Sequence, residues 1–251
     1  YTAYKTIVIR EITRFMRIWP QTILPPAITM TLYFIIFGNL IGKRIGTMDG
    51  FSYMEFIVPG LIMMSVITSS YANVVSSFFS MKFQRSIEEI LIAPVPNYII
   101  IAGFVTGGVA RGLLVGFIVT LVSIFFTGLS IDNYFITVSV IVMTAILFSI
   151  AGMINAVFAR NFDDISIVPT FILTPLTYLG GVFYSIKLLP EFWQAVSLSN
   201  PILHMVNAFR FGVLGKSDLN IFYAMIMIVG FIIILTGTTL YLLKKGTGMR
   251  S

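Results

Sequence analysis

The chain has 251 residues, of which 57% are hydrophobic and only 10% are charged, and its mean hydropathy is +0.97. Because the apolar residues form long blocks and do not alternate with polar ones, this composition excludes an ordinary soluble domain and indicates an integral membrane protein. The net charge is +6, and the absence of cysteine excludes disulfides and thiolate metal sites.

The first predicted element is an amphipathic helix at residues 1–18. One face carries Ile7, Val8, Ile12, Phe15, Met16 and Trp19, and the other carries Lys5, Arg10, Arg14 and Arg17. Such a helix lies flat in the membrane interface, where anionic headgroups would hold it and fix the first span. Contact with a cytoplasmic partner is the alternative use of its basic face.

Six hydrophobic stretches then predict six spanning helices, at about 20–42, 56–80, 101–127, 134–158, 165–186 and 220–243. All but the third lie in uncharged runs longer than the roughly 20 residues that a spanning helix needs, and only Arg111 interrupts the third. The stretches lack the alternating pattern of a transmembrane barrel. The sequence therefore predicts an all-α polytopic membrane protein with a single transmembrane domain, residues 1–251.

A charged segment at residues 81–96 separates the second and third stretches. It is predicted to form a short amphipathic helix from Lys82 to Ala93, with Phe83, Ile87, Ile90 and Leu91 on one face and Lys82, Arg85, Glu88 and Glu89 on the other. Pro94-Val95-Pro96 ends this helix and redirects the chain into the next span. We expect a soluble partner to bind this helix, and an ordinary solvated loop helix is the alternative.

The uncharged run at 192–209 is short and contains Asn200, Pro201 and His204, so it is predicted to be re-entrant or interfacial. The single histidine, without cysteine or a nearby carboxylate, predicts no metal site or proton relay. Gly215-Lys216-Ser217 is not the end of a phosphate-binding loop, because Arg210 stands where that loop requires glycine. The chain is therefore expected to be no enzyme and to bind no cofactor itself.

The distribution of Lys and Arg predicts the orientation. Six spans place both termini on one side, together with Lys5, Arg10, Arg14, Arg17, Lys82, Arg85, Arg160, Lys244, Lys245 and Arg250. The opposite side holds Lys43, Arg44, Lys187, Arg210 and Lys216. Since cytoplasmic loops carry the excess of basic residues, both termini and the 81–96 segment are predicted to be cytoplasmic.

Arg111 is the intramembrane charge. An unpaired arginine at mid-bilayer costs about 2.5–3.5 kcal/mol, so we expect it to face protein or water. It would serve as a substrate or gating contact, form a salt bridge to Asp163 or Asp164, or extend to the interface. Glycines 103, 107, 108, 112 and 116 surround it with the small-residue spacing that allows another helix to approach closely.

Several motifs in a fixed order carry a family resemblance over essentially the whole chain. They are Phe51-Ser52-Tyr53 with Pro59-Gly60, Phe83-Gln84-Arg85 with Glu88-Glu89 and Ala93-Pro94-Val95-Pro96, Gly107-Gly108-Val109-Ala110-Arg111-Gly112, Phe162-Asp163-Asp164 with Pro169-Thr170-Phe171, the run Leu173 to Phe183, and Asn200-Pro201 with Phe209-Arg210. With these motifs the sequence resembles the permease subunit of ABC-2 type transporters.

The resemblance implies an ABCG-like, type V exporter architecture. In it, 1–18 would be the connecting helix, 81–96 the coupling helix and 187–218 the external re-entrant element of a homodimer. Two copies of a separate ABC ATPase subunit would bind ATP and Mg. The implied ATPase contacts are Arg85, Ile87, Glu88, Glu89 and Ile90. Because the second and fifth spans line the pathway in that family, the implied pathway residues are Tyr71, Asn73, Thr174, Tyr178 and Phe183.

The expected function is the membrane-spanning subunit of an exporter that moves an amphipathic, lipid-like, drug or glycan substrate across the bacterial inner membrane. Its partners would be the ATPase, a second copy of the chain and membrane lipids, with no nucleic acid. A secondary transporter or channel without an ATPase partner is the alternative. A proton-coupled transporter would be expected to bury carboxylates near the midplane, whereas the acidic residues here lie near span ends or in loops.

Overall fold

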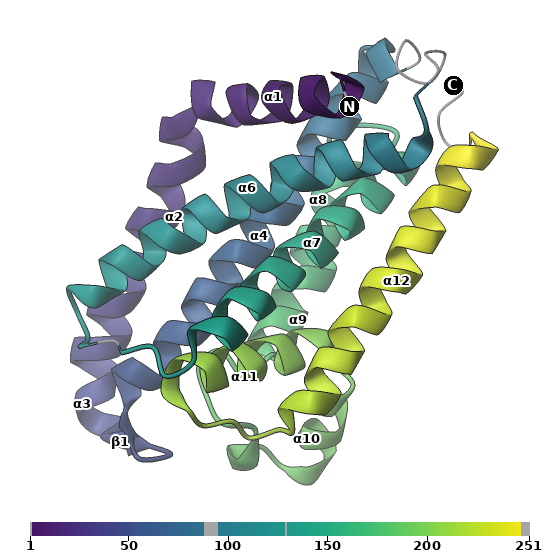
Figure 1. Cartoon of the computed structure of the whole chain (residues 1–251). Coiled ribbons are helices and arrows are strands. Elements are labelled where there is room, and N and C mark those ends of the chain that lie inside the picture. The colour runs from purple at the N-terminus through teal and green to yellow at the C-terminus, as the bar shows by residue number, and fades with distance from the viewer. Residues whose placement is uncertain (1, 88–94, 129, 247–251) are drawn as a thin grey trace.

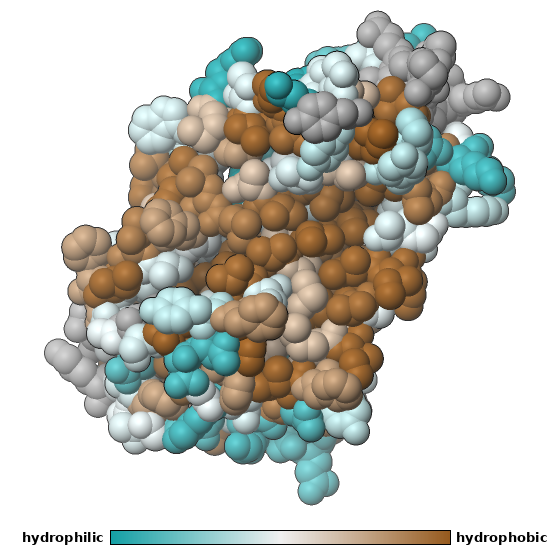
Figure 2. Space-filling model, in the orientation of Figure 1, coloured by the Kyte–Doolittle hydropathy of each residue, from teal (hydrophilic) through white to brown (hydrophobic). Residues whose placement is uncertain are grey.

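A computed structural model describes residues 2–87, 95–128 and 130–246. Within these ranges nearly all regular structure is helical (Figure 1), as the sequence predicts. The exception is a small antiparallel hairpin, in which β1 (Thr47–Met48) pairs with β2 (Phe51–Ser52). The long helices run side by side, and polar residues gather at the two ends of a mostly apolar face (Figure 2). The all-α membrane fold class is therefore confirmed.

Helix α1 (Thr2–Arg17) lies across one end of the bundle, which is also where α12 (Ile221–Lys245) finishes (Figure 1). We name this the α1 end, and the opposite end, which carries β1 and β2, the hairpin end. Helix α2 (Trp19–Tyr33) descends from α1 with Pro20 in its first turn and continues as the π-helical segment η1 (Phe34–Ile41) and the short α3 (Gly42–Ile45).

Helix α4 (Tyr53–Phe83) is the central element and is buried along most of its length. A capping box starts it: the Ser52 side chain accepts from the Glu55 N–H, and the Glu55 carboxylate accepts from the Ser52 N–H. Glu55 is thus a capping residue. The helix packs against α6 (Asn97–Ile124) and α7 (Tyr134–Phe158).

Glycines allow these three helices to approach closely. A Cβ on Gly108 would collide with the Ser149 side chain, and a Cβ on Gly112 with that of Ser70. A Cβ on Gly152 would lie 2.7 Å from the Tyr71 carbonyl oxygen. The glycines around Arg111 therefore pack helices together, as their spacing predicts.

The chain after α7 is broken into short pieces. They are α8 (Asp164–Val168), the π-helical η2 (Pro169–Leu173), α9 (Thr174–Tyr178), the 3₁₀ turn η3 (Ile186–Leu188), α10 (Glu191–Leu198) and α11 (Pro201–Leu214). The predicted span at 165–186 is wrong in its extent, because its helical part ends at Tyr178. Gly181 then has a positive φ of 66° within the irregular stretch that follows.

By length and composition, five helices among the described residues could cross a bilayer: 19–38, 53–83, 97–124, 134–158 and 221–245. The span at 134–158 has its predicted bounds, because Asn133 caps its first turn and the apolar run ends with the helix. The third is shifted toward the N-terminus, from 101–127 to 97–124, since Pro96 is its N-cap. Helix α4 extends beyond the predicted 56–80 at both ends. The sixth span stays a prediction.

Candidate functional site

The end of α4 differs from the predicted helix at Lys82 to Ala93. Lys82 and Phe83 are the last residues of α4, Gln84 is its C-cap, and Arg85 has a positive φ of 60° before the chain becomes helical again at residues 86 and 87. Phe83 is 62% exposed whereas Ile87 is 1% exposed. These two residues therefore do not share one helical face, because the break at Gln84-Arg85 rotates the chain between them.

Of the implied ATPase contacts, Arg85 lies at this break and Ile87 is buried just after it. Glu88, Glu89 and Ile90 lie outside the described residues, and their part in a partner contact stays a prediction. Pro96 is the N-cap of α6 and leads directly into it.

Lys82 joins the end of α4 to the end of α7. Its Nζ donates to the carbonyl oxygens of Val157 and Ala159, at 2.6 Å each. A lysine that satisfies the last carbonyls of a neighbouring helix also complements that helix's dipole. Phe162, just beyond α7, packs edge-on against Phe79 and Phe83, with ring centroids 4.9 and 5.2 Å apart. The end of α4 is therefore held against the end of α7 and the turn after it.

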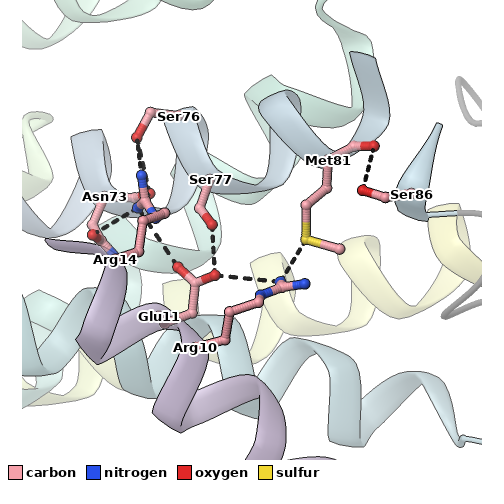
Figure 3. A network of polar contacts seen from close by, with 8 residues as sticks. All are labelled: Arg10, Glu11, Arg14, Asn73, Ser76, Ser77, Met81 and Ser86. Carbon is pink, nitrogen blue, oxygen red and sulfur yellow. Dashed lines mark hydrogen bonds and ion pairs between the residues drawn. The ribbon is translucent and has the colours of Figure 1, made fainter. Parts of the chain in front are cut away.

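A buried polar network fixes α1 on α4 (Figure 3). Glu11 is fully buried and accepts a 2.6 Å hydrogen bond from the Ser77 hydroxyl. Its carboxylate also pairs with Arg10 at 3.4 Å and with Arg14 at 3.6 Å. The predicted helix at 1–18 is confirmed, but its buried face is Ile7, Glu11 and Phe15, while Ile12 and Met16 remain exposed.

Arg14 extends this network into α4. Its Nη2 donates to the backbone carbonyl oxygen and to the side-chain Oδ1 of Asn73, at 2.9 Å each, and its Nη1 donates to the Ser76 hydroxyl at 3.4 Å. Burial lowers the pKa of the Arg14 guanidinium, and the neighbouring Glu11 carboxylate opposes that shift. Asn73, implied as a pathway residue, is therefore occupied in holding α1.

Helix α1 is also seated in the glycines of α6. A Cβ on Gly103 would lie 2.6 Å from the Ile7 side chain, and a Cβ on Gly107 would lie 2.5 Å from the Glu11 Cβ. The Tyr4 and Thr106 hydroxyls lie 2.9 Å apart. The sequence did not single out Glu11, because a glutamate on a basic amphipathic helix is ordinarily solvated; its four-residue spacing from Ile7 and Phe15 was the available signal.

The other implied pathway residues fall into two groups. Tyr71 and Thr174 line a cavity of about 80 Å³ between α4 and the broken helix η2–α9. Tyr178 and Phe183 belong to an aromatic cluster, in which Phe183 stacks on Phe37 and Tyr178 with centroid distances of 5.0 and 6.1 Å. The structure thus brings together Tyr71 with Thr174 and Tyr178 with Phe183, and it separates Asn73 from both pairs.

Arg111 is half-buried on α6, and its buried Nε has no hydrogen-bond partner among the described residues. The salt bridge considered with Asp163 or Asp164 does not form in the described part of the chain. Asp164 instead accepts from the backbone N–H of Arg160 at 2.7 Å and of Asn161 at 3.3 Å. The carboxylate that would have reached Arg111 is thus used to close the turn after α7.

At the hairpin end, Arg210 of α11 is 3% exposed. It donates to the carbonyl oxygens of Gly181 at 2.7 Å and Phe56 at 3.3 Å, and its guanidinium lies 3.9 Å from the centre of the Phe56 ring. It thereby connects α11, α4 and the chain after α9. In the sequence, Arg210 served only to exclude a phosphate-binding loop. Its position at the end of the uncharged run 192–209 was the available signal that it is buried.

Arg210 also lines a cavity of about 650 Å³ together with Lys187 and Asp218. Lys187 and Asp218 form an ion pair at 2.9 Å, and the hydrogen bond to Asp218 raises the pKa of the Lys187 ammonium. His204, for which the sequence predicted no chemistry, has its Nε2 2.8 Å from the Leu198 carbonyl oxygen near the end of α10. Arg210, the Lys187–Asp218 ion pair and His204 thus connect the short helices at the hairpin end.

Comparison with known proteins gives one family. Residues 2–214 match the family model described as "ABC-2 type transporter". The chain is 60% identical over 251 residues to the "Inner membrane transport permease YadH" of Escherichia coli strain K12, which covers 100% of this chain and 98% of that protein. It is 24% identical over 191 residues to "Nodulation protein J" of Rhizobium leguminosarum bv. viciae, covering 76% and 74% of the two chains.

Proposed function

Since the chain belongs to the ABC-2 type transporter family and is an ABC transporter permease, we propose that it is the membrane-spanning subunit of an exporter driven by a separate ABC ATPase. In this proposal two copies of the chain form a homodimer with two ATPase subunits, which bind ATP and Mg. The complex moves an amphipathic, lipid-like, drug or glycan molecule outward across the bacterial inner membrane. The similarity to a protein named an inner membrane permease supports the location.

The proposed topology has six spans, with both termini and the α1 end in the cytoplasm and residues 187–218 outside. The excess of Lys and Arg on that side supports the orientation. The sixth span would include the broken helix at 164–178, which is shorter than the roughly 20 residues of a regular span. Broken helices are tolerated at membrane depth where they are covered by protein or line a water-filled cavity.

The observation that carries the coupling mechanism is the attachment of the segment after α4 to the rest of the bundle. The Lys82 cap on α7, the Phe79, Phe83 and Phe162 contacts and the entry into α6 at Pro96 all lie beside it. ATP-driven movement of a partner bound at 85–90 would therefore tilt α4 and α6 and displace the end of α7. Such tilting would open a central path alternately to the two sides.

The proposed path passes the Tyr71 and Thr174 cavity and then the aromatic cluster of Tyr178 and Phe183. Both include residues of the broken segment η2–α9, since Thr174 lines the cavity and Tyr178 belongs to the cluster. A π-helical turn frequently marks a functional position within a helix, and η2 begins at Pro169 beside this cavity. ATPase stimulation of the reconstituted complex over a panel of lipids, drugs and glycans would identify the substrate class.

The partner contact is tested by reversing the charge of Glu88 and Glu89 with the double variant Glu88→Lys/Glu89→Lys. We expect loss of co-purification with the ABC ATPase and loss of export. Glu191→Lys is the matched control, because Glu191 is exposed on α10 at the hairpin end. Retention of both association and export by the double variant would contradict the proposed docking contact.

A secondary transporter or channel without an ATPase is the second candidate. Vesicles that contain the chain alone distinguish the two mechanisms. Movement of substrate driven by an ion gradient in the absence of ATPase and ATP would support the second candidate and contradict the first.

A further inference from the structure

A groove of about 770 Å³ lies at the α1 end, between α1 and the last turns of α4. Arg10, Arg14 and Arg17 line it from α1, and hydroxyl groups of Ser77 and Ser80 line it from α4. None of the described residues that line the groove is acidic. We name this feature the α1–α4 groove.

The charges around the groove do not balance. Glu11 is the one carboxylate that the described arginines of α1 contact, and it is fully buried, with its oxygens directed to Ser77, Arg10 and Arg14. Arg17 forms no ion pair with a described residue, and the buried Nε of Arg14 has no hydrogen-bond partner among them. Three guanidinium groups beside one carboxylate leave an excess of positive charge, which together with the Ser80 hydroxyl suits a phosphate group.

The rim of the groove is apolar. Ile9 and Ile18 line it and are 52% and 38% exposed. Met16, seven residues after Ile9 and on the same face of α1, is 46% exposed, and Trp19 at the start of α2 is 50% exposed. Free phosphate makes no use of such side chains, whereas acyl chains do, and tryptophan is enriched at the level of lipid headgroups.

We propose that the α1–α4 groove binds the phosphate headgroup of an acidic phospholipid, with the acyl chains along Ile9, Met16 and Trp19. Basic pockets between membrane helices are suited to such headgroups. The groove also reaches Gln84 and Ser86, on the two sides of the backbone break at Arg85. A bound lipid therefore contacts both α1 and the start of the segment proposed to meet the ATPase.

The test uses the full chain purified in a neutral detergent and titrated with dioleoyl phosphatidylglycerol or dioleoyl phosphatidylcholine, with binding followed by native mass spectrometry. Phosphatidylglycerol is expected to bind more tightly. Each basic residue near an anionic lipid contributes about 1 kcal/mol, so Arg10→Gln/Arg17→Gln should weaken this binding by roughly tenfold to thirtyfold. Lys5→Gln, an exposed residue of α1 that does not line the groove, is the control and should bind as the parent does.

Arg14 is left unchanged in the test because it holds Asn73. Equal affinity for the two lipids, or unchanged phosphatidylglycerol binding by the double variant, would overturn the proposal. Displacement of the lipid by millimolar inorganic phosphate would overturn the lipid assignment in favour of a free-phosphate site. Loss of ATPase association in the double variant with unchanged lipid binding would identify the groove as a protein-docking surface instead. Failure of the exporter proposal would leave these lipid measurements unaffected.

Discussion

The two ends of the molecule bury arginine side chains in different ways. At the α1 end, Arg14 is held by a carboxylate, an amide and a hydroxyl from side chains of α1 and α4. At the hairpin end, the more deeply buried Arg210 is held by two backbone carbonyl oxygens and an aromatic ring. The first arrangement depends on one particular side chain, Glu11, whereas the second depends on the path of the backbone. Substitutions should therefore affect the two ends by different mechanisms.

The largest effect is expected from Glu11→Ala. Breaking a buried ion pair leaves an uncompensated charge, and this change should lower the free energy of unfolding by about 3 kcal/mol, at the lower end of the range for such pairs because both arginines are partly exposed. Chemical unfolding in detergent measures the loss. Glu11→Gln keeps the side-chain size and an acceptor for Ser77, so it should lose less; a stable Glu11→Ala variant would show that the network does not hold α1.

Arg210→Lys should have the next largest effect, about 2 kcal/mol. A lysine cannot reproduce the planar fork that contacts the Gly181 and Phe56 carbonyl oxygens, nor the stacking on the Phe56 ring. Arg44→Lys, at an exposed position of α3, is the control. Thermal unfolding of the two variants decides the point, and equal stability would contradict the role assigned to Arg210.

Gly107→Ala tests how α1 is seated, with an expected loss of about 1–2 kcal/mol. The new Cβ would meet the Glu11 Cβ, which is attached directly to the backbone of α1 and can move only with it. Gly237→Ala on α12 is the matched control, because nothing lies within 4 Å of its added Cβ. Replacing this exposed helical glycine should be neutral or stabilise by up to about 1 kcal/mol. Equal changes in the two variants would contradict close packing at Gly107.

The smallest effect concerns the Lys187–Asp218 ion pair. Because the pKa of Lys187 is raised in the folded state, the stability it contributes is present below its ordinary value of 10.5 and is lost as the pH rises through the folded value. The contribution should be less than about 1 kcal/mol, since the lysine side chain is 65% exposed. The free energy of unfolding should fall more between pH 8 and pH 11 in the parent than in Lys187→Met. Parallel pH profiles of the two proteins would contradict this.

Much of the helical fold was predictable, because hydropathy and caps are local signals. The span at 134–158 has its predicted bounds, and the glycines of α6 pack as their spacing indicates. Two predictions of where a helix begins or ends failed. Lys82 reads as the start of a solvated helix but lies in the last turn of α4, where its Nζ donates to a carbonyl oxygen of α7. The span at 165–186 reads as continuous, yet its helix stops at Tyr178.

The candidate site was predictable only in part. Tyr71 lies with Thr174 and Tyr178 with Phe183, and their part in a pathway stays a prediction, whereas Asn73 is used by Arg14 of α1. A single sequence does not tell a pathway asparagine from one that holds another helix. In both cases the buried amide needs a polar partner, and the partner of Asn73 is 59 residues away in the chain. The residues 88–90 remain a prediction from the family resemblance.

The composition and hydropathy of the sequence by themselves determined that the chain crosses membranes and is helical, and its motifs carried the resemblance to ABC-2 permeases. Only the tertiary structure decided which charges are buried. Glu11 and Arg210 look like surface residues in the sequence, and each is buried against groups that the fold brings from at least 29 positions away. The free energy of a buried charge depends on those distant partners, which local hydropathy does not contain.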